Sequence, residues 1–206
     1  CLHYIFNTFP SDLTVIPDDT FNHCSITSVL IPTTVTKIGA NAFSFTSLTS
    51  ITIPTSINII SSGTFIRCTS LTSVTIPTSV HTISVSAFSD CFSLDSITIP
   101  TSVNTISSGA FNACIRLSSI NIPTSVNVIS GGVFFRCKSL TSIIIPISIN
   151  TIDLYVFMEC ISLTSITIPT SVNTINVGTF MGCTSLTSVI IPTCIITISD
   201  STFMDC

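Results

Sequence analysis

The 206-residue sequence contains few charged side chains and no tryptophan. Only 7% of its residues are Asp, Glu, Lys or Arg, against about a quarter in an average globular chain. The five cations and nine anions are scattered singly, so no basic stripe is available to hold a phosphate backbone. This distribution argues against nucleic acid as a partner, and it predicts a surface covered by hydroxyl groups rather than by charges.

Long apolar runs are also missing. Prolines interrupt the Ile-rich segments, so no stretch approaches the ~18–20 apolar residues that a membrane-spanning helix needs. A hydrophobic fraction of 46% is nevertheless ample for a buried core. We therefore expect a globular chain with no membrane span in this segment.

The prolines that are present recur with a fixed period, and each is followed at constant offsets by a phenylalanine and a cysteine. Seven turns of the pattern are 23 residues long, which is typical of a solenoid. The repeated residues are Pro54, Pro77, Pro100, Pro123, Pro146, Pro169 and Pro192, then Phe65, Phe88, Phe111, Phe134, Phe157, Phe180 and Phe203, then Cys68, Cys91, Cys114, Cys137, Cys160, Cys183 and Cys206.

The same phase extends to the start of the sequence. We expect one solenoid domain over residues 1–206, with a diverged first coil at 1–23, coils of 22 residues at 24–67 and regular coils of 23 residues at 68–206. That makes nine stacked coils. Because both ends fall at the same phase of the repeat, we interpret the chain as a slice of a longer one.

Within one repeat, the apolar residues alternate as in a short parallel strand. Leu71, Val74 and Ile76 show this alternation, and Pro77 ends it because proline cannot donate to a strand ladder. A second brief extended segment follows before the phenylalanine and cysteine, which lie in a tight turn. Several repeats have a glycine ahead of this turn, where a positive φ is expected; these are Gly63, Gly109, Gly132 and Gly178. The sequence predicts a mostly β fold, with a parallel sheet on one face and short 3₁₀ turns.

The pattern at Leu94–Ile106 and Gly109–Cys114 closely resembles the BspA-like, treponemal-type leucine-rich repeat. The match covers the whole chain, with departures at Thr46, which occupies a Cys position, and at the weak strand of residues 4–9. The resemblance implies a surface-exposed or extracellular attachment protein. It supplies no fixed catalytic motif, and fold alone does not supply function.

The ten cysteines do not form a recognisable metal motif. C-x-x-C pairs are absent and the spacing is that of the repeat, so we expect a column of reduced, buried thiols. Stacked side chains that point in parallel would not easily reach the dihedral angle of a disulfide. Cys194 replaces a serine, and we predict that it faces outward as a reactive thiol.

The histidines suggest no active site. His3, His23 and His81 fall at different phases of the repeat, so none is placed as a base beside a nucleophile. Asp18, Asp19 and His23 could hold a cation, although a solvated loop explains them equally well. We therefore expect no enzyme, no metal and no cofactor.

Outward positions of the first strand form rows of small polar residues, which are the candidate binding face. They either keep the sheet soluble, recognise a repetitive partner such as a glycan, a polymer or ice, or pack solenoids side by side. Trp, Tyr and Arg, the usual anchors of protein interfaces, are absent from the rows. The candidate residues are Ser50, Thr52, Ser73, Thr75, Ser96, Thr98, Ser119, Asn121, Ser165 and Thr167.

A second candidate surface follows the repeated phenylalanine. Apolar residues share this phase and, if exposed, would make a ridge that a partner could bind; alternatively, they fold over the edge of the core. The residues of this partner ridge are Ile66, Phe135, Met158, Met181 and Met204. A row of asparagines is interpreted as an amide ladder between coils: Asn58, Asn104, Asn127, Asn150 and Asn173.

The leading hypothesis is a non-enzymatic surface or secreted adhesion module that presents its Ser/Thr-rich face to a protein or a glycan. The alternative is a structural solenoid that associates laterally with other copies of itself into filaments or arrays.

Overall fold

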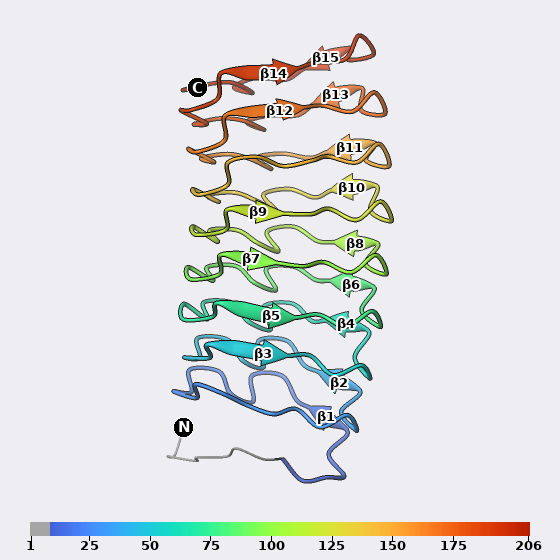
Figure 1. Ribbon diagram of the computed structural model, residues 1–206, viewed down its shortest axis with the longest axis vertical. Coiled ribbons are helices and arrows are strands. Elements are labelled where there is room, and N and C mark those ends of the chain that lie inside the picture. Colours follow the sequence, from blue (N-terminus) through green and yellow to red (C-terminus); the bar gives the residue numbers. More distant parts are fainter. Residues whose placement is uncertain (1–8) are drawn as a thin grey trace.

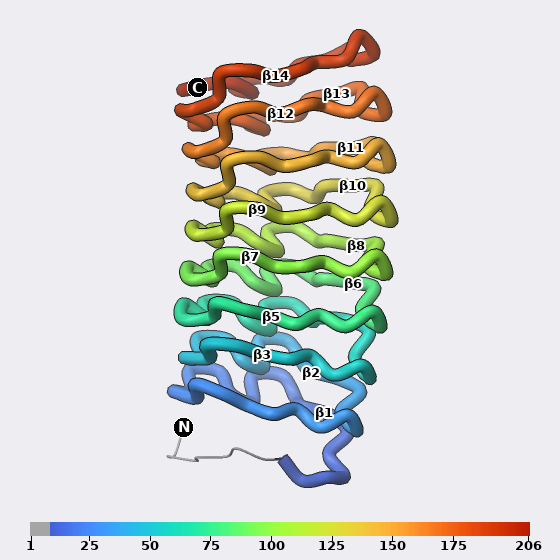
Figure 2. The backbone as a smooth tube through the Cα atoms, viewed as in Figure 1, coloured from blue at the N-terminus to red at the C-terminus, as the bar shows by residue number. Residues whose placement is uncertain are grey.

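The computed structural model describes residues 9–206, which form a regular solenoid of stacked coils (Figure 1). The coils are evenly spaced from the first described residues to the C-terminal end (Figure 2). Every element in this part of the chain is a short strand, and no helix occurs there. The mostly β solenoid expected from the sequence is therefore confirmed. The weak strand expected at residues 4–9 lies, apart from Phe9, outside the described residues.

The strands form two columns that run along the solenoid. A coil with two strands contributes one strand to each column. The first column comprises β3 (Ser50–Thr52), β5 (Ser73–Thr75), β7 (Ser96–Ile97), β9 (Ser119–Ile120), β12 (Ser165–Thr167) and β14 (Ser188–Ile190). The second comprises β1 (Val15–Ile16), β2 (Lys37–Ile38), β4 (Ile59–Ile60), β6 (Thr82–Ile83), β8 (Thr105–Ile106), β10 (Val128–Ile129), β11 (Thr151–Ile152), β13 (Thr174–Ile175) and β15 (Thr197–Ile198).

All strand pairs are parallel and join equivalent positions of neighbouring coils. The first column divides into the pairs β3–β5, β7–β9 and β12–β14, whereas the second contains the longer sheets β4–β6–β8 and β10–β11–β13–β15. In Figure 1 the first column lies in front, and its arrows point the opposite way to those of the second column behind it. We call the outward sides of these columns the first and the second sheet face.

The repeated proline ends the first strand and begins the turn that reverses the chain. In this turn the carbonyl of Pro54 accepts a hydrogen bond from Ile57 N at 3.0 Å, and the same contact recurs in later coils. The expected short 3₁₀ turns appear as single turns of this kind, such as Cys68 N to Phe65 O at 3.1 Å. None of them continues into a 3₁₀-helix in the described residues.

The repeated phenylalanines form the centre of the core. From Phe21 to Phe203 each ring stacks on the next, with centroids 5.2–6.1 Å apart and planes within 12° of parallel. The rings between these two ends are completely buried. Burying such a side chain contributes about 1.5–3 kcal/mol, and each ring is covered only because a neighbouring coil lies on it.

The repeated cysteines donate hydrogen bonds to backbone carbonyl groups of the preceding coil. The Cys91 thiol donates to the carbonyl of Phe65 in the preceding coil at 3.2 Å, and the equivalent contact recurs up to Cys206, whose Sγ lies 3.1 Å from Phe180 O. A cysteine fits here because it is small and apolar yet still a weak donor. Thr46 replaces it in one coil and donates to Phe43 O at 2.8 Å instead.

Each complete coil contains two residues with positive φ, two positions before and two positions after the phenylalanine. The four glycines expected to adopt this conformation do so. The same sites hold Tyr155, Arg67 and Arg136, with φ of 57°, 57° and 59°, although side chains disfavour this region. The turn leaves Arg136 N to donate to Met158 O of the next coil at 2.8 Å. Stacking of the coils therefore imposes the turn, whatever residue occupies it.

Two adjacent phenylalanines allow the role of the ring stack to be measured. We expect Phe134→Ala to lower the free energy of unfolding by about 3–5 kcal/mol, because Phe134 is fully buried between two rings. The matched control is Phe135→Ala, whose half-buried ring lies 4.9 Å from the Arg136 guanidinium and should cost much less. Urea titrations followed by circular dichroism compare the two; equal losses would contradict the assignment of the core.

Candidate functional site

The first sheet face presents the polar rows that the sequence predicted. All ten candidate residues are exposed. The strand register places Ser50 beside Ser73 and Ser96 beside Ser119, so equivalent hydroxyls are separated by one strand spacing, about 4.8 Å. The face thus combines residues from distant parts of the sequence into one regular array.

The hydroxyls of this face are free to bind something outside the protein. Among the ten candidates only Ser96 has a side-chain hydrogen bond, a 3.5 Å contact of its Oγ with Asp95. Serines in the turn after the repeated proline behave differently, since Ser79 and Ser102 donate to carbonyls of the preceding coil at 2.6 and 2.7 Å. Exposed hydroxyls without an internal partner can donate to and accept from a ligand.

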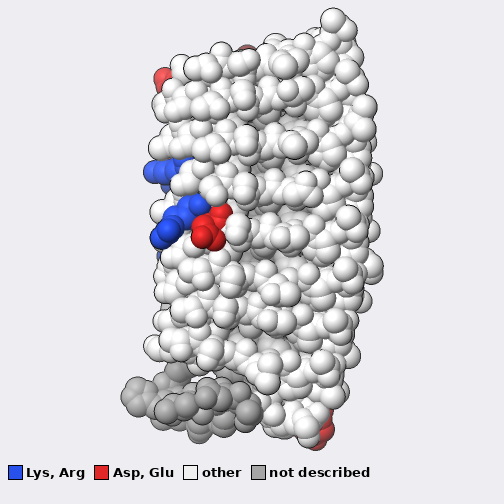
Figure 3. Space-filling model, in the orientation of Figure 1, with Lys and Arg blue, Asp and Glu red and all other residues white. Residues whose placement is uncertain are grey.

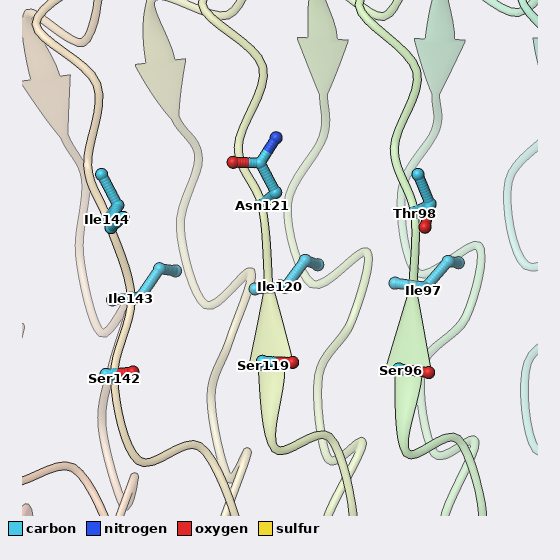
Figure 4. Close-up of a pocket in the computed structure, with 9 residues that line it drawn as sticks. All are labelled: Ser96, Ile97, Thr98, Ser119, Ile120, Asn121, Ser142, Ile143 and Ile144. Atoms are coloured by element: carbon cyan, nitrogen blue, oxygen red, sulfur yellow. The ribbon is translucent and has the colours of Figure 1, made fainter.

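A shallow groove of about 380 Å³ crosses this face. Its rim is polar at the serines and at Thr98 and Asn121, whereas Ile97, Ile120 and Ile143 form an apolar floor (Figure 4). The nine lining residues come from three successive coils: Ser96, Ile97, Thr98, Ser119, Ile120, Asn121, Ser142, Ile143 and Ile144.

The groove lies where the strand pairing of the first column is interrupted. Residues 142–144 form no strand, and this coil is joined to its neighbour on the face by a single bridge between Asn121 and Ile144. Ile144 is 80% exposed, and Ile147 beyond the following proline is 72% exposed. The groove therefore adjoins an apolar spot on an otherwise hydroxylated surface.

The residues that line the groove are uncharged. None of the nine is an acid or a base, although the exposed Asp95 carboxylate accepts from the lining Ser96 at 3.5 Å. In Figure 3 the few Lys, Arg, Asp and Glu atoms on this side lie mainly along one edge. Two ion pairs occur in the described residues, Arg67–Asp90 at 3.5 Å and Arg136–Glu159 at 2.9 Å. Both join turns of neighbouring coils, so they connect coils rather than form a charged site.

The side chains of the partner ridge are mostly half-buried. Ile66, Phe135, Met158 and Met181 are half-buried, and only Met204 in the last coil is exposed. Of the two interpretations that the sequence left open, the structure favours the one in which these side chains fold over the edge of the core.

The asparagine row does not form the predicted amide ladder. Asn104 Oδ1 accepts a hydrogen bond from Thr105 Oγ1 at 2.9 Å, and Asn150 and Asn173 accept in the same way from the threonine that follows each. These contacts stay within one coil, and no hydrogen bond in the described residues joins two asparagines of the row. The ladder prediction is wrong, and three of the five asparagines accept from the hydroxyl of the next residue instead.

The cysteines of the core are free, buried thiols from Cys68 to Cys183, as expected. Burial raises their pKa, since a thiolate would lose its hydration there. The expectation of reduced thiols is wrong at Cys24, which is disulfide-bonded. Cys194 does not face outward either, because it is half-buried and its Sγ lies 3.1 Å from Thr170 O and 3.3 Å from Val172 O. It takes the place of the turn serine as a donor.

The acidic residues near the N-terminal end have structural partners. Asp18 Oδ1 accepts from Ala40 N at 2.9 Å, Asp19 accepts from Asn22 at 3.2 Å, and the His23 ring stacks on Phe45 with centroids 4.2 Å apart. In residues 9–206 no three His, Cys, Asp or Glu side chains are grouped to hold a metal ion. His3 lies outside the described residues. This part of the chain also contains no helix long and apolar enough to cross a membrane.

Comparison with known families agrees with the repeat. A model of the BspA type leucine rich repeat region, comprising six copies, matches residues 5–117 and again residues 81–206. The chain belongs to the BspA-type leucine-rich repeat family. Repeat proteins of this type are generally surface-associated, non-enzymatic binding modules. A comparison with curated protein sequences finds no match.

Solved leucine-rich repeat structures are similar over most of the chain. A leucine-rich repeat protein from Bacteroides ovatus is 26% identical, with a TM-score of 0.56 over 96% of this chain and 69% of that one. A leucine rich cell surface protein from Faecalibacterium prausnitzii is 25% identical, with a TM-score of 0.52 over 93% of this chain and 74% of that one. A Treponema pallidum protein, 22% identical with a TM-score of 0.55 over 90% and 66%, supports the fold alone.

Sequence reasoning missed the second sheet face as a surface. Its outward row is β-branched in nearly every coil, and the exposed side chains include Val15 at 40%, Ile59 at 47% and Val128 at 41%. The sequence did contain a signal, because a β-branched residue recurs at this position of the repeat. The second strand, however, is too short to show an alternation of polar and apolar residues.

The raised thiol pKa values predict a pH dependence of stability. Burial raises the pKa of Cys183 from 9.0 to about 12. Between these values the unfolded chain releases the proton and the folded chain keeps it, so the free energy of unfolding falls as pH rises. The stability that the protonated Cys183 thiol contributes is complete below pH 9 and is lost towards pH 12. The free energy of unfolding falls by up to about 1.4 kcal/mol per pH unit in this range.

The Cys183→Ala variant should therefore show a shallower fall in unfolding free energy between pH 9 and pH 11 than the parent chain. Thr184→Ala, an exposed neighbour, is the control and should keep the parent slope. Denaturant titrations at several pH values measure both slopes. Identical slopes for Cys183→Ala and the parent would show that the thiol ionises equally in both states.

Proposed function

We propose that this chain is a non-enzymatic adhesion module of a cell surface or of a secreted protein, which binds a protein or a glycan through its first sheet face. The observation that carries the proposal is the groove on that face, bordered by hydroxyl and amide groups of which only Ser96 has a side-chain partner inside the protein. Family membership supports a binding role, and it does not specify the ligand.

The groove has the size and composition of a binding site. Its volume of about 380 Å³ falls in the range of ligand pockets, roughly 300–1,000 Å³. An apolar floor of Ile97, Ile120 and Ile143 supplies contact area, and the hydroxyls of Ser119 and Thr98 with the Asn121 amide supply direction. The lack of charge favours a neutral partner surface, because no lining side chain would pair with a phosphate, sulfate or carboxylate.

The shape of the solenoid extends this site beyond one groove. Polar residues of the same repeat phase recur from Ser50 to Thr167, with an interruption at Ile144, so a long or repetitive partner could contact several coils at once. Contacts that are weak singly then add up through a high effective concentration. This is the arrangement expected of an adhesion surface rather than of an enclosed small-molecule site.

The test is a binding screen against immobilised extracellular matrix proteins, mucin and neutral glycans, with two matched variants. Ser119→Lys places a long cation in the groove and should weaken binding tenfold or more. The control is Thr69→Lys, at an exposed position where another coil already carries Lys138, and it should bind like the parent. If no probe binds the parent chain, or if Ser119→Lys binds as tightly as Thr69→Lys, the proposed face is wrong.

A further inference from the structure

Two exposed isoleucines adjoin the groove of the first sheet face, and both belong to one interior coil. Ile144 is 80% exposed and Ile147 is 72% exposed; we call them the isoleucine pair. Four other coils carry threonine at both positions, as at Thr98 and Thr101. The exposure is no effect of a solenoid end, because further coils lie on both sides. Exposed apolar side chains that gather beside a groove mark an interaction site.

The opposite edge of the same coils carries two cations. Arg116 and Lys138 are exposed, and neither is in an ion pair in the described residues. They lie on neighbouring turns, because Ser139 N donates to Ile115 O at 3.1 Å. These turns lie where the segments of the first sheet face begin, whereas the isoleucine pair lies where one of them ends. Figure 3 shows basic atoms along this edge.

Acidic groups near this edge leave Lys138 without a counter-charge. Glu159 is held by Arg136 at 2.9 Å. Asp95 belongs to the coil before that of Arg116 and lies two coils from that of Lys138, roughly 10 Å at one strand spacing per coil and about one Debye length. In Figure 3 one group of basic atoms on this edge adjoins acidic atoms, and the group above it does not. An added carboxylate therefore gains most at Lys138, which shares its coil with the isoleucine pair.

We infer that the first sheet face binds an extended segment of a partner protein, which places an apolar side chain over the isoleucine pair and a carboxylate at Lys138. The inference rests on the proposed function and goes further, because it selects a protein over a glycan. A neutral glycan offers no charge to a cation and little apolar surface to cover two isoleucines. A peptide supplies both an aliphatic or aromatic side chain and an aspartate or glutamate.

The groove fits between these two contacts. Its end at Ser142 and Ile143 is uncharged, so it takes the neutral part of the segment, and the carboxylate lies beyond it. Residues 140–143 separate the turn of Lys138 from Ile144. Since an extended segment advances about 3.3 Å per residue, we expect the acidic and the apolar residue of the partner roughly three to five positions apart.

The two contacts have different roles. An exposed ion pair at an edge adds little affinity by itself, but it sets the direction of the segment and speeds association. Covering the isoleucine pair removes apolar surface from water and supplies most of the affinity. The two contacts are therefore tested separately.

The first experiment selects peptides from a phage-displayed random library on the full chain and measures their dissociation constants by fluorescence anisotropy. We expect the enriched peptides to carry Asp or Glu at the stated spacing from an apolar residue. The paired variant Ile144→Thr/Ile147→Thr, which restores the residues of other coils, should raise their dissociation constants tenfold or more. Ile196→Thr removes an equally exposed isoleucine from the last coil and should change nothing.

Two results overturn the inference: no enrichment over a blank support, or enriched peptides that bind the paired variant as tightly as the parent. Failure here is distinguishable from failure of the proposed function. If a neutral glycan binds the parent chain and is lost with Ser119→Lys while no peptide is enriched, the face binds a ligand and that ligand is not a protein segment.

The second experiment tests the carboxylate by reversing charges. Lys138→Glu should weaken an enriched acidic peptide several-fold, and the loss should shrink as salt is added. The same peptide with its acid replaced by lysine should bind Lys138→Glu better than it binds the parent. Lys37→Glu changes an exposed cation on the second sheet face and should bind the acidic peptide like the parent. A lysine peptide that does not prefer Lys138→Glu would show that no carboxylate lies at Lys138. Circular dichroism spectra verify that each variant is folded.

Discussion

The structure depends on each coil being covered by its neighbours. A single 23-residue unit cannot bury a phenylalanine, a leucine and several isoleucines by itself, and in interior coils these side chains are nevertheless almost completely inaccessible. The near-parallel stack of rings and the thiol contacts to the preceding phenylalanine carbonyl both require identical residues at identical heights. The fixed period is thus a packing requirement, and a departure such as Thr46 is tolerated because its hydroxyl donates to a carbonyl of its own coil, Phe43 O.

The same stacking divides the surface into two faces with different chemistry. On the first, the outward hydroxyls have almost no internal partners and an uncharged groove interrupts the sheet. On the second, the hydroxyls of Thr105, Thr151 and Thr174 are bonded to the preceding asparagine, and β-branched side chains are partly exposed over longer sheets. One repeat therefore presents two surfaces of different chemistry.

Local competition explains the predictions that failed. The asparagine ladder was inferred from spacing along the solenoid, yet the Asn104 amide oxygen accepts from the hydroxyl of the adjacent Thr105 at 2.9 Å. Cys194 was expected to face outward because its serine counterparts looked like surface residues. In the structure Ser79 and Ser102 donate to backbone carbonyls of the preceding coil. Cys194 occupies the equivalent position and makes the same kind of contact. Both errors arose where a side chain had a backbone or neighbouring partner that the repeat pattern does not display.

The sequence by itself determined the solenoid, the length of its coils, the residues of its core and the outward rows of the first sheet face. The reason is that a strict period places equivalent residues of successive coils directly above one another. It also identified four of the glycines that adopt positive φ. Only the tertiary structure decided that Tyr155 and Arg136 adopt the same conformation, that the sheet is interrupted at Ile144, and that the second face carries exposed β-branched residues. These features depend on hydrogen bonds and exposure between coils, which residue identity alone does not specify.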